Sequence, residues 1–263
     1  MENTIEIHDL GFVKLLDVMG DDQEVENAAR ISYGEGTRKV SQTRNLIRYL
    51  MRHKHTSPFE MCEVKFHLKL PIFVMRQLVR HRTANLNEYS GRYSVMSDEF
   101  YLPEGDYLAK QSTTNNQGRG GSLKHSQGLL QFEFNRIYDG AAMAYHVLLE
   151  NELSREVARA VLPVANYTEC IWKIDLHNLM HFLSLRFDKH AQYEIRVYAE
   201  LILKIMKKWV PYTYDAFVKH RLDGMSFSED GLIYVRKLLS GVKNVSTKIS
   251  QREKKEINKI LEI

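Results

Sequence analysis

The chain has 263 residues, of which 44% are hydrophobic and 27% are charged, a balance typical of a globular protein that buries a sizeable core. Lysine and arginine total 37 against 33 acidic residues, and the net charge of +4 is too small for a protein that binds nucleic acid mainly through non-specific phosphate contacts. We therefore expect any basic site to be local.

Cysteine, histidine and the N-terminal residues indicate the compartment and the available chemistry. Cys62 and Cys170 are too few for a disulfide framework or a four-cysteine zinc site, and they suit a reducing, cytoplasmic location. Residues 1–4 lack the basic start of a signal peptide, and no run approaches the roughly 20 apolar residues of a membrane helix, so we expect no membrane partner. The 11 histidines stand out, because histidine titrates near neutral pH and also binds metals.

Hydrophobic periodicity predicts much of the secondary structure. Glycine (14) and proline (5) are scarce, which favours long helices over many short strands. Residues 61–70 alternate between apolar and polar side chains and predict a strand with one wet face, and residues 167–174 predict a second strand. Helices are expected at residues 21–32, 41–52 with Ser41 as N-cap, 72–81, 127–151, 154–161, 175–187 and 192–209.

Two segments differ from this pattern. Residues 104–127 contain three closely spaced glycines and almost nothing to bury, so we expect a mobile surface loop. Residues 250–263 are charged and carry Ile257, Ile260 and Leu261 at helical spacing, which predicts a peripheral or oligomer-contacting helix. The sequence has no internal repeat and no linker that cleanly divides two domains.

The densest polar cluster of the chain runs from Arg80 to Tyr93. Its arginines can bind phosphate or carboxylate through paired hydrogen bonds, and Gly91 allows a ligand to approach the backbone. Arg82 falls on the apolar face of the helix expected at 72–81, so either the helix ends before it or its guanidinium reaches an internal partner. The cluster predicts an anion-binding site; the alternative is a surface helix end with ion pairs.

The spacing within this cluster resembles the signature of flavin-dependent thymidylate synthases. The matching residues are Arg80-His81-Arg82, then seven residues, then Ser90 followed by Gly91-Arg92-Tyr93. The similarity extends through residues 28–32, 55–60, 156–163, 183–186 and 190–194, and it covers roughly residues 5–220.

This resemblance implies a fold, an assembly and a reaction. We expect an α/β (α+β) fold, a helix-rich single domain with a mixed or antiparallel sheet at residues 1–220, a loop insertion at about 104–127 and a C-terminal helical extension at 221–263. The family implies a homotetramer whose active sites gather residues from several chains. It also implies a methyltransferase that converts dUMP to dTMP by reductive methylation, with FAD as cofactor, 5,10-methylenetetrahydrofolate as one-carbon donor and NADPH as reductant.

The family's site residues carry over by matching position. The dUMP-binding residues are expected to be Gln77, Arg80, Glu88, Ser90, Gly91, Arg92, Arg159 and Arg186. The FAD-binding residues are expected to be Ser32, Ser57, Arg80, His81, Arg82, Glu88, Asp175, His177 and His181, with the rings of His55 and Tyr93 stacked near the flavin. Arg186 matches a catalytic arginine that polarises the uracil ring and favours its N3-ionised form, a role that suits a permanently charged guanidinium.

Some positions depart from the family or exclude other chemistry. Asp175 and His177 stand where the family often has Asn and Arg, and an aspartate is repelled by a flavin pyrophosphate unless it accepts a hydrogen bond from a ribose hydroxyl or adenine amine. Neither cysteine has the setting of the nucleophile that the unrelated folate-dependent synthases use, and we expect both cysteines to pack in the core. We expect Ser90 to donate to a ligand, since no base is evidently placed to activate it as a nucleophile.

Two other functions stay open at this point. His177 and His181, at i and i+4, could join His53, His55 or His190 in a metal-dependent hydrolase, but the glutamate of a zinc-protease motif is absent and we expect no metal. A nucleic-acid-binding module could instead use basic and stacking side chains, namely Arg76, Arg80, Arg82, Arg92, Tyr89 and Tyr93. The small net charge and the interleaved Glu88 oppose that function, so we expect no nucleic-acid partner.

Overall fold

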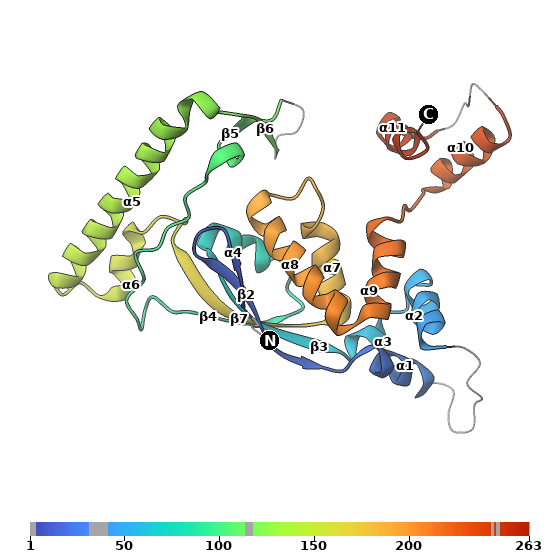
Figure 1. Cartoon of the computed structure of the whole chain (residues 1–263), viewed down its shortest axis with the longest axis horizontal. Helices are drawn as coiled ribbons and strands as arrows, with labels where there is room; N and C mark the ends of the chain where they lie inside the picture. Colours follow the sequence, from blue (N-terminus) through green and yellow to red (C-terminus); the bar gives the residue numbers. More distant parts are fainter. Residues whose placement is uncertain (1–3, 32–41, 114–117, 243–244, 246–247, 263) are drawn as a thin grey trace. The chain divides into compact units, whose positions relative to one another are not determined.

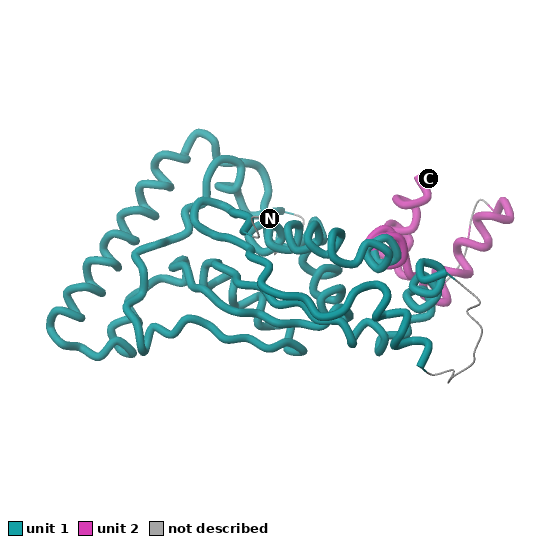
Figure 2. Tube along the Cα trace, turned by 60° about the horizontal axis from the view of Figure 1, so that its bottom comes forward, with its two compact units in different colours: residues 1–217 teal, residues 218–263 magenta. Residues whose placement is uncertain are grey.

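The computed structural model describes residues 4–31, 42–113, 118–242, 245 and 248–262. The chain forms two compact units, Met1–Phe217 and Val218–Ile263 (Figure 2). The first unit contains the sheet and the long helices, and the second contains a pair of shorter helices. The domain boundary expected at 220/221 stays a prediction.

The first unit is built around an antiparallel sheet of five strands in the order β1-β2-β3-β7-β4 (Figure 1). The strands are β1 (Thr4–Ile7), β2 (Gly11–Met19), β3 (Glu63–Pro71), β4 (Asn85–Glu88) and β7 (Tyr167–Asp175). β3 and β7 confirm the two predicted strands. Periodicity does not predict the others, because β1 and β4 are only 4 residues long and β2 alternates only in its first half. The fold is therefore α+β, with an antiparallel sheet.

One face of the sheet is apolar and lies against helices α7 (Leu176–Arg186) and α8 (Tyr193–Trp209) (Figure 1). Phe66 of β3 and Trp172 of β7 are each 1% exposed, and the Trp172 ring lies edge-on to Phe182 of α7 at a centroid distance of 5.2 Å. Burying side chains of this size contributes roughly 1.5–3 kcal/mol each. The apolar side of β3, which the alternation predicts, thus helps to form the face that packs against α7, and α7 ends at Arg186.

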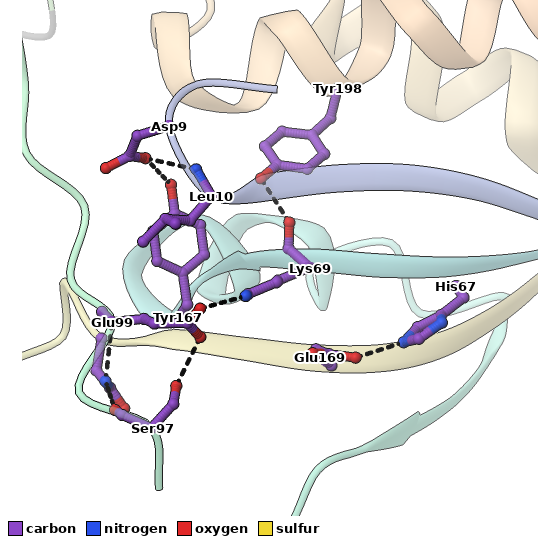
Figure 3. A network of polar contacts seen from close by, with 10 residues as sticks. Asp9, Leu10, His67, Lys69, Ser97, Glu99, Tyr167, Glu169 and Tyr198 are labelled. Atoms are coloured by element: carbon purple, nitrogen blue, oxygen red, sulfur yellow. Dashed lines mark hydrogen bonds and ion pairs between the residues drawn. The ribbon is translucent and has the colours of Figure 1, made fainter. Parts of the chain in front are cut away.

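The opposite face of the sheet carries ion pairs, one between the neighbouring strands β3 and β7 and one from β3 to the segment that follows β4. The ring of His67 pairs with Glu169 at 2.7 Å, and the Lys69 ammonium pairs with Glu99 at 2.7 Å (Figure 3). Both pairs are partly buried, and ion pairs that keep contact with water contribute about 0–1 kcal/mol each to stability. Their main effect is to make this face of the sheet polar, as the alternation of β3 predicts.

Each of the predicted helices is found, with some differences at the ends. The remaining helices of the first unit are α1 (Asp22–Arg30), α2 (Thr43–Arg52), α3 (Ser57–Glu60), α4 (Ile72–Leu78), α5 (Gln127–Glu150), α6 (Arg155–Ala158) and α9 (Pro211–Phe217). The helix expected at 154–161 consists of α6 and a 3₁₀ turn, Arg159–Val161. Ser32 and Ser41, which the sequence places at helix ends, lie outside the described residues.

Helix α5 presents an apolar surface that the described residues of the chain leave uncovered. Only Tyr138 and Tyr145 of its 24 residues are buried, and Figure 1 shows the helix extending away from the sheet. Its exposed apolar side chains are Leu129, Phe132, Phe134, Ile137, Met143 and Val147. Apolar patches of this kind mark interaction surfaces. Among the described residues, neither α5 nor another helix is long and apolar enough to cross a membrane.

The described parts of the segment 104–127, namely 104–113 and 118–127, contain regular secondary structure. They contain the hairpin of β5 (Ala109–Gln111) and β6 (Arg119–Ser122), flanked by 3₁₀ turns at Gly105–Tyr107 and Lys124–Ser126. Leu108 is only 6% exposed, and Arg119 pairs with Glu194 of α8, whose side chain is 1% exposed. Sequence patterns miss these anchors because they are single residues scattered among glycines and polar side chains.

The second unit has a small core of its own. It consists of a π-helical turn, Val218–Leu222, and two helices, α10 (Glu229–Leu239) and α11 (Gln251–Ile260). Tyr234, Ile249 and Ile257 are buried together, and the Tyr234 hydroxyl donates to Asn258 Oδ1 at 2.8 Å. The helix expected at 250–263 is therefore present, and Ile257 faces this core whereas Ile260 is 59% exposed.

Candidate functional site

The predicted anion-binding residues begin where α4 ends. The helix stops at Leu78, so Arg82 does not lie on its apolar face, and the Arg82 side chain is exposed. Of the two alternatives that the sequence left open, the first is correct: the helix ends before Arg82. The backbone N–H of His81 donates to the carbonyl of Leu78 at 3.0 Å, and this turn directs residues 80–82 towards the end of α7.

Arg186, at the end of α7, contacts His81 directly. Its Nε donates to His81 Nε2 at 3.1 Å, and the His81 ring lies edge-on to Phe182 at a centroid distance of 5.0 Å. Burial, together with the nearby charges of Arg186 and His181, lowers the pKa of His81 to about 4. His81 is therefore neutral at pH 7, with Nε2 free of a proton and able to accept from the guanidinium.

The pKa of Arg186 is itself lowered, first by burial and then by the charge of Arg80. Two guanidinium groups that repel each other in this way favour an anion between them. No ion pair to Arg80, Arg82 or Arg186 occurs among the residues that the structure describes. Within the cluster, the alternative of a surface helix end with ion pairs stays open, because Arg92 pairs with Glu156 at 3.2 Å whereas Arg80 and Arg82 have no such pair among the described residues.

A cavity of about 290 Å³ lies at this point. It is lined by Arg80, His81, Arg82, Thr83, Asn178, His181, Leu185 and Arg186. Thr83, Asn178 and Leu185 are not among the residues that the sequence predicts for the site. Helical spacing does point to Asn178, because it lies three residues before His181 and therefore on the same side of α7. The lining is polar and cationic, which suits a ligand with phosphate groups.

A second group of predicted residues surrounds Gly91, which is buried. A Cβ atom at Gly91 would lie 2.8 Å from Met96 Sδ and 3.1 Å from Arg159 Cδ, so a larger residue would require these side chains to shift. The Arg92 backbone N–H donates to Ser90 Oγ at 3.3 Å, and Arg92 Nε pairs with a carboxylate of α6. This group lies beside a different cavity, of about 500 Å³, which includes Arg92, Tyr93, Arg155 and Glu156.

The remaining predicted residues lie elsewhere in the chain. Glu88 accepts from the Thr168 hydroxyl at 3.0 Å, and His55 stacks on Tyr49 at a centroid distance of 6.0 Å. Ser57 is exposed at the start of α3. The described part of one chain thus places the expected ligand residues in several separate groups. Their joint roles stay predictions.

Asp175 has a structural role in the fold. Its side chain accepts from the Asn178 backbone N–H at 2.9 Å and from the Asn178 side-chain amide at 2.7 Å, which caps the N-terminus of α7. Of the two histidines on this helix, His181 lines the cavity and His177 is half-buried outside it. Among the described residues, no three His, Cys, Asp or Glu side chains gather as a metal site.

Both cysteines are buried, as predicted. Cys62 is 0% exposed and Cys170 is 3% exposed, and burial raises the pKa of each thiol to about 12. Nucleophilic attack requires a thiolate. Neither cysteine is therefore suited to covalent activation of a substrate.

Known proteins are similar to this chain in sequence and fold. A model of the thymidylate synthase complementing protein family matches residues 14–212. The flavin-dependent thymidylate synthase of Ehrlichia ruminantium (strain Gardel) is 56% identical over 260 residues, which cover 96% of this chain and 86% of the relative. The synthase of Wolbachia pipientis wMel is 51% identical, with 97% and 90% covered.

A solved structure agrees with these relatives. The UMP/dUMP methylase PolB from Streptomyces cacaoi, bound with 5-Br dUMP, is 35% identical with a TM-score of 0.74, and the similarity covers 82% of this chain and 98% of that chain. Fold, site and relatives together define a methyltransferase. The chain belongs to the family of flavin-dependent thymidylate synthases.

Proposed function

We propose that this enzyme converts dUMP to dTMP by reductive methylation, with FAD as cofactor, 5,10-methylenetetrahydrofolate as one-carbon donor and NADPH as reductant. The methylene group passes to C5 of the pyrimidine and two electrons from NADPH reduce it to methyl, so the products are dTMP, tetrahydrofolate and NADP⁺. The observation that carries the proposal is the cationic cavity of Arg80, Arg82 and Arg186, in which no acidic side chain among the described residues neutralises the guanidinium groups.

The residues around this cavity fit a flavin dinucleotide. Arg80 and Arg82 suit its pyrophosphate, because guanidinium groups bind phosphate oxygens through paired hydrogen bonds. When bound, the flavin supplies the hydride that reduces the transferred carbon. His81 and His181 would lie against it, with Ser57 and the ring of His55 as further contacts. Asp175 is committed to the cap of α7, so it would contact the ligand only through an oxygen that also serves the cap.

Arg186 is the proposed catalytic residue. A guanidinium next to the pyrimidine stabilises the negative charge that develops as N3 ionises and C5 becomes nucleophilic. His81 fixes the orientation of this group, because it accepts from Nε and leaves the two terminal nitrogens of Arg186 available to the substrate. Gln77, Glu88, Ser90, Gly91, Arg92 and Arg159 are the further proposed dUMP contacts.

We also propose that the enzyme is a homotetramer with active sites at subunit interfaces, in the cytoplasm. The cavity beside Arg186 has about 290 Å³, at the small end of ligand pockets, which span roughly 300–1,000 Å³. This cavity alone is therefore too small for two nucleotides, which supports a site completed by further chains. The uncovered apolar surface of α5 supports association with further copies. The two free, buried cysteines suit a reducing compartment.

The direct test is a reconstituted assay. Purified protein with saturating FAD is mixed with NADPH, dUMP and methylenetetrahydrofolate, and dTMP is measured by chromatography. We expect dTMP formation that requires every component. Absence of dTMP from a folded, flavin-loaded sample would overturn the proposal. No observation favours the metal-dependent hydrolase or the nucleic-acid-binding module.

A further inference from the structure

The segment His190–Glu194 resembles the family, but the proposed function assigns it no role. In the structure it leads into α8, and two of its side chains, Gln192 and Glu194, take part in a continuous series of hydrogen bonds. Glu194 Oε2 accepts from Gln192 Nε2 at 2.9 Å, and Gln192 Oε1 accepts from Gln77 Nε2 at 2.6 Å. The series therefore leads from a buried carboxylate to a residue expected to bind dUMP.

The series of hydrogen bonds begins at Glu194, whose carboxylate is ionised. Its side chain is 1% exposed, and its Oε1 accepts from the guanidinium of Arg119 and from the Tyr101 hydroxyl at 2.9 Å. Burial alone would raise its pKa, but the hydrogen bond and charge of Arg119 outweigh burial and hold the pKa below its ordinary value. An ionised carboxylate only accepts hydrogen bonds. Any group that faces Glu194 Oε2 must therefore donate.

This requirement determines the direction of both amides. Gln192 must present its NH₂ group to Glu194, which turns its carbonyl oxygen towards Gln77. Gln77 must then present its NH₂ group to Gln192, which leaves Gln77 Oε1 facing away from this contact. The orientation of a glutamine amide is normally ambiguous, but a series of hydrogen bonds that ends on a carboxylate has a single consistent assignment.

The Gln192 side chain is not needed to cap its own helix, so it is available for these hydrogen bonds. It is the N-cap residue of α8, yet its side chain makes no capping hydrogen bond to its own helix. Both polar atoms of its amide are used instead between Glu194 and Gln77. Gln192 therefore contributes to the placement of Gln77 and not to the start of its helix.

We propose that Gln192 and Glu194 are positioning residues that hold the Gln77 amide with its carbonyl oxygen towards the bound nucleotide, as a hydrogen-bond acceptor. This inference rests on the proposed function, in which Gln77 contacts dUMP. An acceptor recognises a donor of the nucleotide and repels its phosphate oxygens. Arg119 supports the arrangement from the β5–β6 hairpin, since it keeps Glu194 ionised.

The test is a double-mutant cycle on the flavin-loaded enzyme. Gln77→Met and Gln192→Met each remove one end of the hydrogen bond with little change in volume, and Gln192 is exposed, so the variants are expected to fold. Each single variant should raise the KM and Kd for dUMP about three- to tenfold, the effect of one misplaced hydrogen bond, while kcat changes less than about twofold. The KM and Kd for dUMP of the double variant should equal those of the more impaired single variant, because the two residues act as one unit.

A second variant and a control complete the design. Glu194→Gln keeps the shape but lets position 194 donate as well as accept, so the amide of Gln192 can turn and the KM for dUMP should rise by a similar factor. Gln251→Met, on the exposed side of α11, should leave KM unchanged. Additive effects at Gln77 and Gln192, or a lowered melting temperature with unchanged KM in Gln192→Met and Glu194→Gln, would overturn the inference. If wild-type enzyme forms no dTMP, the proposed function itself fails.

Discussion

Arg186 Nε donates to Nε2 of His81 at 3.1 Å, so a cation and a neutral imidazole are in direct contact in the lining of the cavity. The hydrogen bond needs His81 without a proton on Nε2. The lowered pKa of His81, about 4, satisfies that need throughout the neutral range.

Replacement of the Arg186 guanidinium should slow dTMP formation and leave flavin binding intact. We expect Arg186→Ala to lower kcat for dTMP formation about 10²- to 10³-fold, the usual effect of removing one group that stabilises transition-state charge. Flavin absorbance after gel filtration should persist, because Arg80 and Arg82 remain. Arg252→Ala, in the exposed helix α11, serves as the matched control. Lost flavin with retained turnover in Arg186→Ala would contradict the assigned role.

The pKa of His81 predicts how stability depends on pH. Its folded-state pKa of about 4 lies below the ordinary value of 6.5, so unfolding takes up a proton between these values and stability falls as the pH falls through this window. Urea unfolding at pH 7 and pH 5 measures the effect. We expect a smaller difference between the two pH values in His81→Gln than in wild type. Equal pH dependence in the two proteins would show that His81 titrates normally.

Gly91→Ala should disturb the site through packing. The new methyl group would meet Met96 Sδ at 2.8 Å and Arg159 Cδ at 3.1 Å, so the Met96 side chain must shift and the Arg159 side chain is crowded. Overpacking of this kind costs about 1–3 kcal/mol of unfolding free energy, and we expect a several-fold rise in the KM for dUMP. Gly128→Ala is the control, since apart from its chain neighbours and its own helix backbone no atom of the described residues lies within 4 Å of the added Cβ. Normal KM and stability in Gly91→Ala would refute the close approach.

The cysteines should be dispensable for turnover. Because burial raises the thiol pKa of Cys62 and Cys170 to about 12, neither forms a nucleophilic thiolate at neutral pH. We expect Cys62→Ala and Cys170→Ala to lose about 0.5–3 kcal/mol of unfolding free energy, while kcat stays within about twofold of wild type. A variant that folds and binds flavin but forms no dTMP would argue for covalent catalysis through that cysteine.

Local patterns predicted the local features of this protein. The alternation of residues 61–70 predicts β3 with its buried Phe66. The signature around Arg80 predicts two arginines that line the cavity, Arg80 and Arg82. The spacing also predicts that the helix after Pro71 continues to residue 81, whereas α4 ends at Leu78 and the chain turns there.

Contacts between distant residues could not be predicted in the same way. Gln77 and Gln192 are 115 positions apart, and Arg119 meets Glu194 across 75 positions. Only the folded sheet and helices bring such pairs together, and neither periodicity nor composition contains that information. The separation of residues 80–82 from the Gly91 group, which lie beside different cavities, is likewise a property of the fold, because both belong to one continuous motif in the sequence.

Strand β4 lies at the edge of the sheet, between the two parts of that motif. Residues 80–82 precede it and residues 90–92 follow it, and its residues Asn85–Glu88 pair only with β7 within the sheet. A ligand that engages both flanking segments would therefore hold the strand at both ends and suppress its fraying. Amide hydrogen exchange of Asn85–Glu88 should then slow when the site is filled, so this edge strand reports occupancy without any assay of turnover.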